Sequence, residues 1–303
     1  MTTAHPTTVA DSGDSRRGIA WMLLTMFLFV SMDAIVKHLL QTYPVPQVAW
    51  ARFFFHTVLL AAVLGRRLPA TFATRRRGLQ VLRSGLLTVT TLQFFGGLYF
   101  LPLAEMTAIM QSAPLLVTAL SLPLLGEHVG IRRWAGVAVG FAGALIIIRP
   151  GTEAMQLAAL LPLGAALTFA LYQITTRILS RTDATFNTLL YTPLIGAIAL
   201  SIAAPFFWVM PDLEGWVLMI LTGMFGGLGH FTMIRAFTWA PAATVSPFGY
   251  SALVWAALFG LVLFGDFPDA WTIAGALVIV GSGLYILHRE HMRRRHGPDV
   301  ANS

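Results

Sequence analysis

Apolar residues fill most of the chain in unbroken stretches of about 20 residues, separated by short polar segments. Such stretches are typical of helices that cross a membrane, because a helix satisfies its own backbone hydrogen bonds in lipid. The strands of a membrane barrel would instead alternate apolar and polar positions over about ten residues. Ten stretches fit the helical pattern, near residues 18–39, 46–65, 79–101, 104–125, 132–149, 155–178, 184–208, 215–237, 243–264 and 270–288. The pattern predicts an all-α membrane protein with ten transmembrane helices.

The chain also contains an internal repeat. Residues 101–127 return in diverged form 139 positions later, at residues 240–266. Matching positions include Pro102 with Pro241, Ala104 with Ala243, Thr107 with Ser246, Ser112 with Ser251, Gly126 with Gly265 and Glu127 with Asp266. A two-fold repeat in an apolar chain predicts one five-helix unit used twice.

The repeat sets the expected domain organisation. Residues 16–150 form the first five-helix unit and residues 151–290 the second, between a disordered tail of residues 1–15 and a basic tail of residues 291–303. Because five is odd, the second unit enters the membrane inverted relative to the first. Inverted repeats place a substrate site near the midplane of the membrane, where the two units meet.

Charge placement predicts the orientation. With the N-terminus in the cytoplasm, most arginines fall at cytoplasmic helix ends, Arg83 and the basic C-terminal segment among them. This distribution predicts a multi-pass protein of the cell inner membrane with both termini cytoplasmic. It also explains the net charge of +7 without a nucleic-acid partner, leaving the lipid bilayer and a small-molecule substrate as expected partners.

Several kinds of chemistry are disfavoured. The chain has no cysteine, which excludes disulfides and thiolate metal sites. His288, His291 and His296 lie in an arginine-rich segment that indicates a membrane anchor, so no metal and no cofactor are expected. The chain has no His-Glu-x-x-His, Gly-x-Ser-x-Gly or Walker lysine motif, so the protein is not expected to be an enzyme. A membrane-embedded enzyme or a sensor stays an alternative.

The stretch AEMTAIMQSAPLLVTALSLPLLGEHVGIRRWAGVAVGFAGALIIIRPG and its echo resemble the drug/metabolite transporter superfamily, in its EamA-type branch. The Asp33-Ala-x-x-Lys37 motif, the Tyr43-Pro44 turn and Arg52 are similar to that branch's bacterial members. The resemblance covers residues 16–290. It implies a secondary transporter, in a family whose members carry amino acids, nucleotide sugars, riboflavin, S-adenosylmethionine or other metabolites.

Charged residues inside the first two apolar stretches are candidate substrate contacts. Asp33 and Lys37 lie four residues apart on one helix face, and Arg52 is expected at a similar depth on the next helix, with His56 one turn deeper. A charge inside a membrane costs at least about 2.5 kcal/mol, so these groups are expected to cluster. The cluster either clamps the two helices or anchors a substrate.

Polar residues beside prolines provide the second group of candidates. Gln111 and Ser112 precede Pro114, and the matching stretch of the second unit carries Pro247 and Tyr250. Proline-interrupted helices at corresponding places in two repeats point to a transport site. The full set of expected substrate-binding residues is Asp33, Lys37, Arg52, Gln93, Gln111, Ser112, Tyr172, His230, Tyr250 and Trp255.

These expectations describe a carrier, monomeric or homodimeric, that works by alternating access. Since the charges of both signs would suit a zwitterion, export of an amino acid or a related metabolite is the first expectation. Uptake of a vitamin or nucleoside-like metabolite, such as riboflavin or S-adenosylmethionine, is the alternative.

Overall fold

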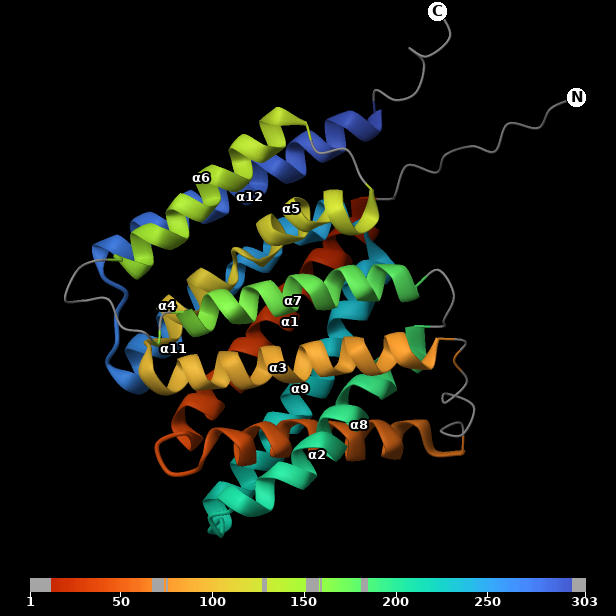
Figure 1. The fold of residues 1–303 in the computed structure, drawn as a ribbon, viewed down its shortest axis with the longest axis vertical. Coiled ribbons are helices and arrows are strands. Elements are labelled where there is room, and N and C mark those ends of the chain that lie inside the picture. Colours follow the sequence, from red (N-terminus) through yellow and green to blue (C-terminus); the bar gives the residue numbers. More distant parts are fainter. Residues whose placement is uncertain are drawn as a thin grey trace, which may run out of the picture.

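The computed structural model describes residues 12–66, 74, 76–126, 130–150, 158, 160–180 and 185–295. These residues form helices and no strand, which confirms the all-α prediction (Figure 1). Glu127, His296 and most of both expected tails lie outside the described residues. The α-helices are α1 (Ser12–Leu39), α2 (Val45–Leu64), α3 (Arg77–Phe100), α4 (Leu103–Met110), α5 (Ala113–Leu125), α6 (Ile131–Ile148), α7 (Leu160–Leu179), α8 (Thr185–Ala203), α9 (Leu213–Trp239), α10 (Ala242–Val245), α11 (Ser251–Phe264) and α12 (Ala270–Arg295).

Eight helical segments of the described chain are long and apolar enough to cross a membrane. Helices lie at all ten expected places, but α3 and α7 are not among these eight, so the count of ten spans is not confirmed. In α3 the reason is a row of polar residues, which includes Gln80, Arg83, Thr88 and Thr91. These four side chains are buried within the bundle, so this polar row of α3 faces the interior.

The two units are inverted relative to each other. In Figure 1, α1 runs from the upper right toward the lower left. Its counterpart in the second unit, α7, runs in the opposite sense, from left to right. The same reversal relates α3 to α9 and α6 to α12, and α12 ends on the side where α1 begins. This arrangement agrees with an inverted repeat.

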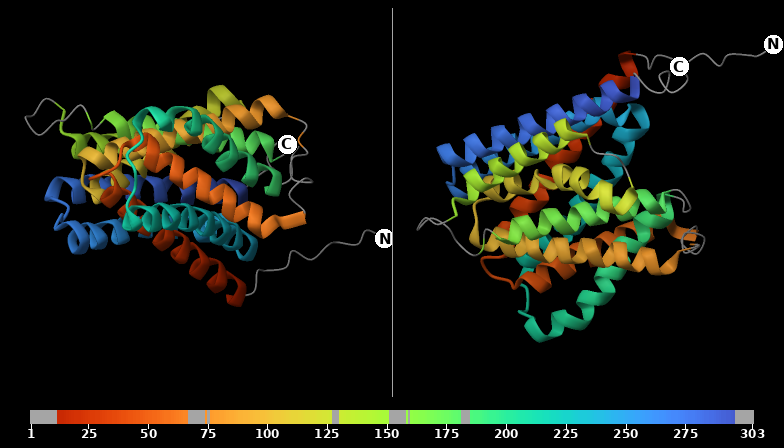
Figure 2. Two further views of the ribbon diagram at one scale, coloured as in Figure 1. Left: turned by 90° about the horizontal axis from the view of Figure 1, so that it is seen from below. Right: turned by 45° about the horizontal axis from the view of Figure 1, so that its top comes forward.

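Contacts between the units follow the same symmetry. The first helix of each unit packs on the third helix of the other, as α1 on α9 and α7 on α3. The two fifth helices, α6 and α12, lie side by side along one edge (Figure 2). The units are therefore intertwined, and the centre of the bundle is built from both.

Glycines let α6 and α12 approach closely. A Cβ atom at Gly143 would lie 2.9 Å from the Gly275 carbonyl oxygen, and one at Gly275 would lie 2.5 Å from the Gly143 carbonyl oxygen. Ser282 also donates a hydrogen bond to the Gly136 carbonyl. The small residues of these helices thus serve packing inside the bundle.

The fourth helix of each unit is broken. In the first unit, a turn at Gln111 and Ser112 separates α4 from α5, and Pro114 lies in the first turn of α5, where a missing amide donor is tolerated. In the second unit, the 3-10 helix η4 (Ser246–Tyr250), which contains Pro247, separates α10 from α11. The expected interruptions are present at matching positions.

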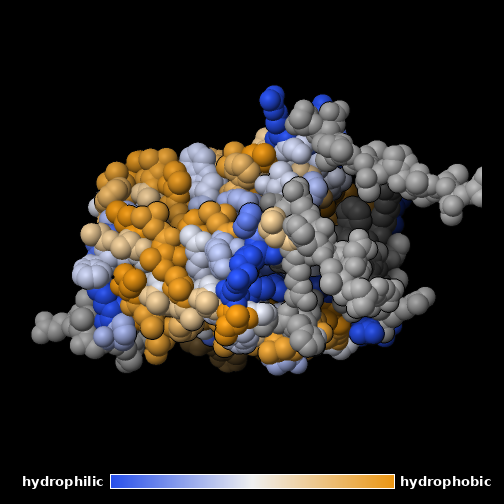
Figure 3. All heavy atoms as spheres, turned by 90° about the horizontal axis from the view of Figure 1, so that it is seen from above, coloured by the Kyte–Doolittle hydropathy of each residue, from blue (hydrophilic) through white to orange (hydrophobic). Residues whose placement is uncertain are grey.

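The outside of the bundle suits a lipid environment. The face in Figure 3 carries a broad hydrophobic area, with hydrophilic side chains gathered nearer its centre. Large apolar side chains such as Val139 of α6 and Leu277 of α12 are exposed. An apolar perimeter around a partly polar interior is the pattern of a membrane-embedded protein.

Candidate functional site

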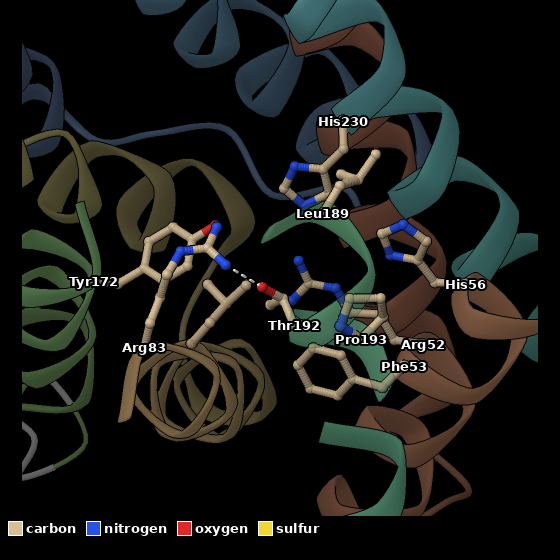
Figure 4. Close-up of a pocket in the computed structure, with 10 residues that line it drawn as sticks. Arg52, Phe53, His56, Arg83, Tyr172, Leu189, Thr192, Pro193 and His230 are labelled. Carbon is tan, nitrogen blue, oxygen red and sulfur yellow. Dashed lines mark hydrogen bonds between the residues drawn. The ribbon is translucent and has the colours of Figure 1, made fainter. Parts of the chain in front are cut away.

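Two arginines and two histidines line a small cavity between α2, α3, α7, α8 and α9, here called the arginine cavity (Figure 4). Its volume is about 20 Å³, which is room for a water-sized group. The lining residues are Arg52, Phe53, His56, Arg83, Leu87, Tyr172, Leu189, Thr192, Pro193 and His230. Three of the expected substrate-binding residues, Arg52, Tyr172 and His230, are therefore brought together.

Arg83 occupies one side of this cavity. Its guanidinium donates hydrogen bonds to Thr176 (2.6 Å), Thr192 (2.5 Å) and the Tyr172 hydroxyl (2.7 Å). It also lies 4.5 Å from the centre of the Tyr172 ring. Arg83 was expected at a cytoplasmic helix end; the structure adds that its side chain is 5% exposed and points into the bundle.

Arg52 approaches from α2. Its Nη1 donates to Thr91 Oγ1 of α3 at 2.8 Å, and the guanidinium lies 5.5 Å from the centre of the Phe53 ring. Asp33 of α1 is buried and interacts electrostatically with Arg52. Within the described part of the chain, neither a hydrogen bond nor an ion pair to the Asp33 carboxylate is present. The acid and the arginine are thus coupled through space without direct contact.

The two histidines stack on each other. Their ring centres lie 5.6 Å apart with the planes at 17°. His56 is 4% exposed, and its Nε2 has no hydrogen-bond partner among the described residues. Gly227 of α9 makes room for this ring, since a Cβ atom there would lie 3.1 Å from it.

Lys37 does not join Asp33 and Arg52 in one cluster, contrary to the sequence-based expectation. Its Nζ donates to the Leu101 carbonyl at 2.8 Å and lies 3.7 Å from the Asp266 carboxylate. The four-residue spacing places Asp33 and Lys37 on one face of α1, but the long lysine side chain reaches acceptors that later parts of the fold bring closer. This contact joins the two units at the end of the bundle opposite the start of α1.

A second ion pair lies at that same end. Arg149, which follows α6, pairs with Asp269, which precedes α12. Asp269 also accepts a hydrogen bond from the Thr272 amide at 2.8 Å, and so caps α12. Partial burial raises the pKa of Asp269, but the hydrogen bonds from Thr272 and Arg149 outweigh this effect and leave the pKa below its ordinary value.

A larger cavity, of about 310 Å³, lies at the breaks of the fourth helices and is here called the break cavity. It is lined by Gln111, Pro114, Leu115, Val117, Thr118, Gln173, Ser246, Gly249, Tyr250, Gly283, Ile286 and Leu287. Gln111 and Tyr250, which match in the repeat, both face it, and Gln111 Nε2 donates to the Gly249 carbonyl at 3.4 Å. Its volume is in the range of small-molecule sites.

The remaining expected residues lie outside the linings of these two cavities. Gln93 accepts a hydrogen bond from Thr168 at 3.0 Å, between α3 and α7. Ser112 is buried at the helix break, and Trp255 packs edge-on against Phe27 with ring centres 5.1 Å apart. Sequence reasoning missed Arg83 and Thr192 as lining residues. The sequence signal that could have identified Arg83 was its position in an apolar stretch that also contains Gln80 and several threonines.

Two inverted units, whose broken fourth helices line a common cavity, form an arrangement that is typical of membrane transporters. The chain belongs to the EamA-like transporter family, whose profile matches residues 16–149 and 156–287. This match agrees with the resemblance seen in the sequence. Since the family consists of transporters, it supports the expectation that the protein is not an enzyme.

Several named transporters are similar to nearly the whole chain. The S-adenosylmethionine uptake transporter of Rickettsia bellii is 29% identical over 273 residues, which is 90% of this chain and 94% of the relative. The riboflavin transporter of Vibrio cholerae is 29% identical over 291 residues, 94% of this chain and 97% of the relative. The pseudopaline exporter CntI of Pseudomonas aeruginosa is 28% identical over 272 residues, 88% of this chain and 94% of the relative.

A protein of known crystal structure shares the fold. The two chains superpose with a TM-score of 0.64, which covers 93% of this chain and 99% of the other, at 20% sequence identity.

Proposed function

We propose that this protein is a secondary transporter that takes up S-adenosylmethionine, or a metabolite of closely related chemistry, by alternating access. The observation that carries the proposal is the near full-length similarity to S-adenosylmethionine uptake transporters from four Rickettsia species. This similarity supports uptake of such a metabolite better than it supports amino acid export, the first expectation from the sequence. The 310 Å³ volume of the break cavity suits a nucleoside-sized solute.

In this proposal α3 and α7 also cross the membrane, which makes ten crossings. Their 24 and 20 residues are long enough to span a membrane, and the two helices pack on each other. The cytoplasmic side is the one where α1 begins and α12 ends, in line with the arginine-rich helix ends, and the membrane is the cell inner membrane. Residues 16–150 and 151–290 then act as the two units that rock against each other.

The proposed substrate-binding residues fall into groups with different roles. Gln111 and Tyr250 contact the body of the substrate in the break cavity, and Ser112 supports the break itself. Arg52, Tyr172 and His230 supply the polar part of the site from the arginine cavity. Asp33 of α1 contributes through its electrostatic interaction with Arg52. Gln93 and Trp255 shape the helices around it, and Lys37 closes the outer end through Asp266.

A second candidate substrate is riboflavin. The relatives from Vibrio cholerae and Rhizobium johnstonii that carry this name are 29% and 28% identical to the chain. Tyr250 gives the break cavity an aromatic ring on which a planar isoalloxazine could stack.

Uptake by cells that overproduce the protein tests the proposal. Labelled S-adenosylmethionine, riboflavin and an amino acid mixture are compared in cells with and without the protein. We expect S-adenosylmethionine to accumulate, and Gln111→Ala to slow its uptake about tenfold because a polar contact in the cavity is lost. Arg235→Gln, which alters an exposed arginine of α9, is the matched control. Accumulation of the amino acids alone would contradict the proposal.

A further inference from the structure

The arginine cavity carries more positive than negative charge. Among the ten residues that line it are two arginines and two histidines, and none of these ten is an aspartate or a glutamate. A buried charge within a membrane is costly unless an opposite charge or strong hydrogen bonds compensate it. A cavity lined in this way favours an anionic group inside it.

The geometry suits a small planar anion. The guanidinium of Arg83 is held by three hydroxyl groups from α7 and α8, which fixes its plane, and Arg52 is oriented by Thr91. Figure 4 shows both guanidinium groups directed into the cavity. Guanidinium groups fit carboxylates well, because both are planar and form paired hydrogen bonds.

His56 provides an independent observation. This side chain is 4% exposed and lines the cavity, and its Nε2 is left without a partner in the described structure. Buried polar atoms are nearly always hydrogen-bonded, so an orphan nitrogen in a cavity indicates a missing partner. The 20 Å³ volume has room for one small group and not for a whole metabolite.

Asp33 is an acidic residue that interacts electrostatically with Arg52. It is buried on α1 outside the lining of the arginine cavity, and has neither a hydrogen bond nor an ion pair with the described residues. We propose that Arg52 and Arg83 bind the carboxylate, and Asp33 the ammonium group, of an α-amino acid head group carried by the transported substrate. The proposal rests on the transport function proposed above and favours a substrate such as S-adenosylmethionine over riboflavin, which has no such head group.

A matched pair of ligands tests this inference without any mutation. S-adenosylmethionine and decarboxylated S-adenosylmethionine share the adenosine, the sulfonium and the amine, and differ in the carboxylate. Binding of each to the purified protein in detergent is measured by calorimetry. We expect the decarboxylated compound to bind at least about tenfold more weakly, since charge-assisted hydrogen bonds to the arginines are lost. Equal binding of the two compounds would overturn the inference.

Variants of Arg52 then test whether this residue binds the carboxylate. Arg52→Gln is expected to weaken S-adenosylmethionine about tenfold and to leave the decarboxylated compound unchanged, so that the ratio of the two affinities approaches one. Arg52→Lys keeps the charge and is expected to retain most of the preference for S-adenosylmethionine over the decarboxylated compound. Arg235→Gln is the control. A ratio that stays at the wild-type value in Arg52→Gln would overturn the role of this arginine. A misfolded variant would bind neither compound and would show no thermal unfolding transition. In that case the ratio of the two affinities in the wild-type protein would still test the inference.

Failure of the inference is distinct from failure of the transport proposal. If the protein transports riboflavin and binds neither compound of the pair, transport stands and the head-group site is overturned. If no compound of the uptake panel is carried by folded protein, the proposed function itself fails.

Discussion

The Lys37 ammonium lies 3.7 Å from the Asp266 carboxylate, and it thereby joins the first helix of one unit to the loop that precedes α12 in the other. Lys37 also donates to the carbonyl of Leu101, at the end of α3. In an alternating-access cycle, contacts that join the two units at one end must break when that end opens. In the proposed orientation, the Lys37–Asp266 pair is therefore placed to stabilise closure of the outer end.

Asp266→Asn is expected to favour opening of the outer end. Because the pair is partly exposed, its loss should raise the open population only about two- to fivefold. The chain has no cysteine, so a single Thr107→Cys variant on α4 gives a clean probe. Labelling by a membrane-impermeant thiol reagent from outside is expected to accelerate in Asp266→Asn. Lys37→Glu combined with Asp266→Lys restores the pair and should return labelling to its original rate. Unchanged labelling in Asp266→Asn would contradict this role.

Asp269 makes stability depend on pH. Its pKa is lower in the folded protein than in the unfolded chain, because Thr272 and Arg149 favour the carboxylate over the effect of burial. The stabilisation is therefore present above the ordinary carboxyl pKa and is lost as the pH falls through the lowered value. Asp269→Asn keeps an oxygen to cap α12 and removes only the charge. Thermal unfolding should show a small wild-type advantage at pH 7 that shrinks progressively as the pH falls below the ordinary carboxyl pKa. A difference that persists in acid would contradict the account.

Contact between α6 and α12 should be intolerant of added volume. At Gly143 a Cβ atom would lie 2.9 Å from the Gly275 carbonyl oxygen and 3.0 Å from Ile279, so Gly143→Ala must push the helices apart. We expect a loss of about 1–3 kcal/mol in the free energy of unfolding. Gly281 of α12 has open space around its Cβ position and serves as the control. Equal thermal stability of Gly143→Ala and Gly281→Ala would contradict this packing.

Gly283 controls the position of Tyr250 in the break cavity. A Cβ atom at Gly283 would lie 1.8 Å from the Tyr250 hydroxyl, so Gly283→Ala must displace that ring. Uptake is expected to fall about tenfold or more, because the ring moves within the proposed substrate path. Tyr250→Phe in the Gly283→Ala background removes the clashing oxygen and should restore part of the rate. A double variant no better than Gly283→Ala would contradict this steric relationship.

The sequence predicted the framework well because its signals are local. Runs of apolar residues locate the helices, and a fixed offset of 139 residues reveals the repeat. Pro114 and Pro247 do not match at that offset, but each lies close to the break in its own unit. Since helices that match in a repeat occupy matching places, Gln111 and Tyr250 could be expected to face one cavity, and they do.

The partners of long side chains could not be predicted in this way. Lys37 was expected beside Asp33, but tertiary contacts bring Leu101 and Asp266 closer to its ammonium group. Arg83 lies in the second turn of α3, where a cytoplasmic helix end and a buried site look alike in sequence. Only the packing of α7 and α8 against α3 decides that it points inward.

Counterflow in liposomes shows whether the purified protein itself carries S-adenosylmethionine. Purified protein is reconstituted with unlabelled S-adenosylmethionine inside, and entry of the labelled compound is followed over time. The account predicts transient accumulation of label above equilibrium, which disappears when the unlabelled compound is omitted and falls strongly in Arg52→Gln. Absence of counterflow with S-adenosylmethionine and with riboflavin, from protein that retains its thermal transition, would contradict it.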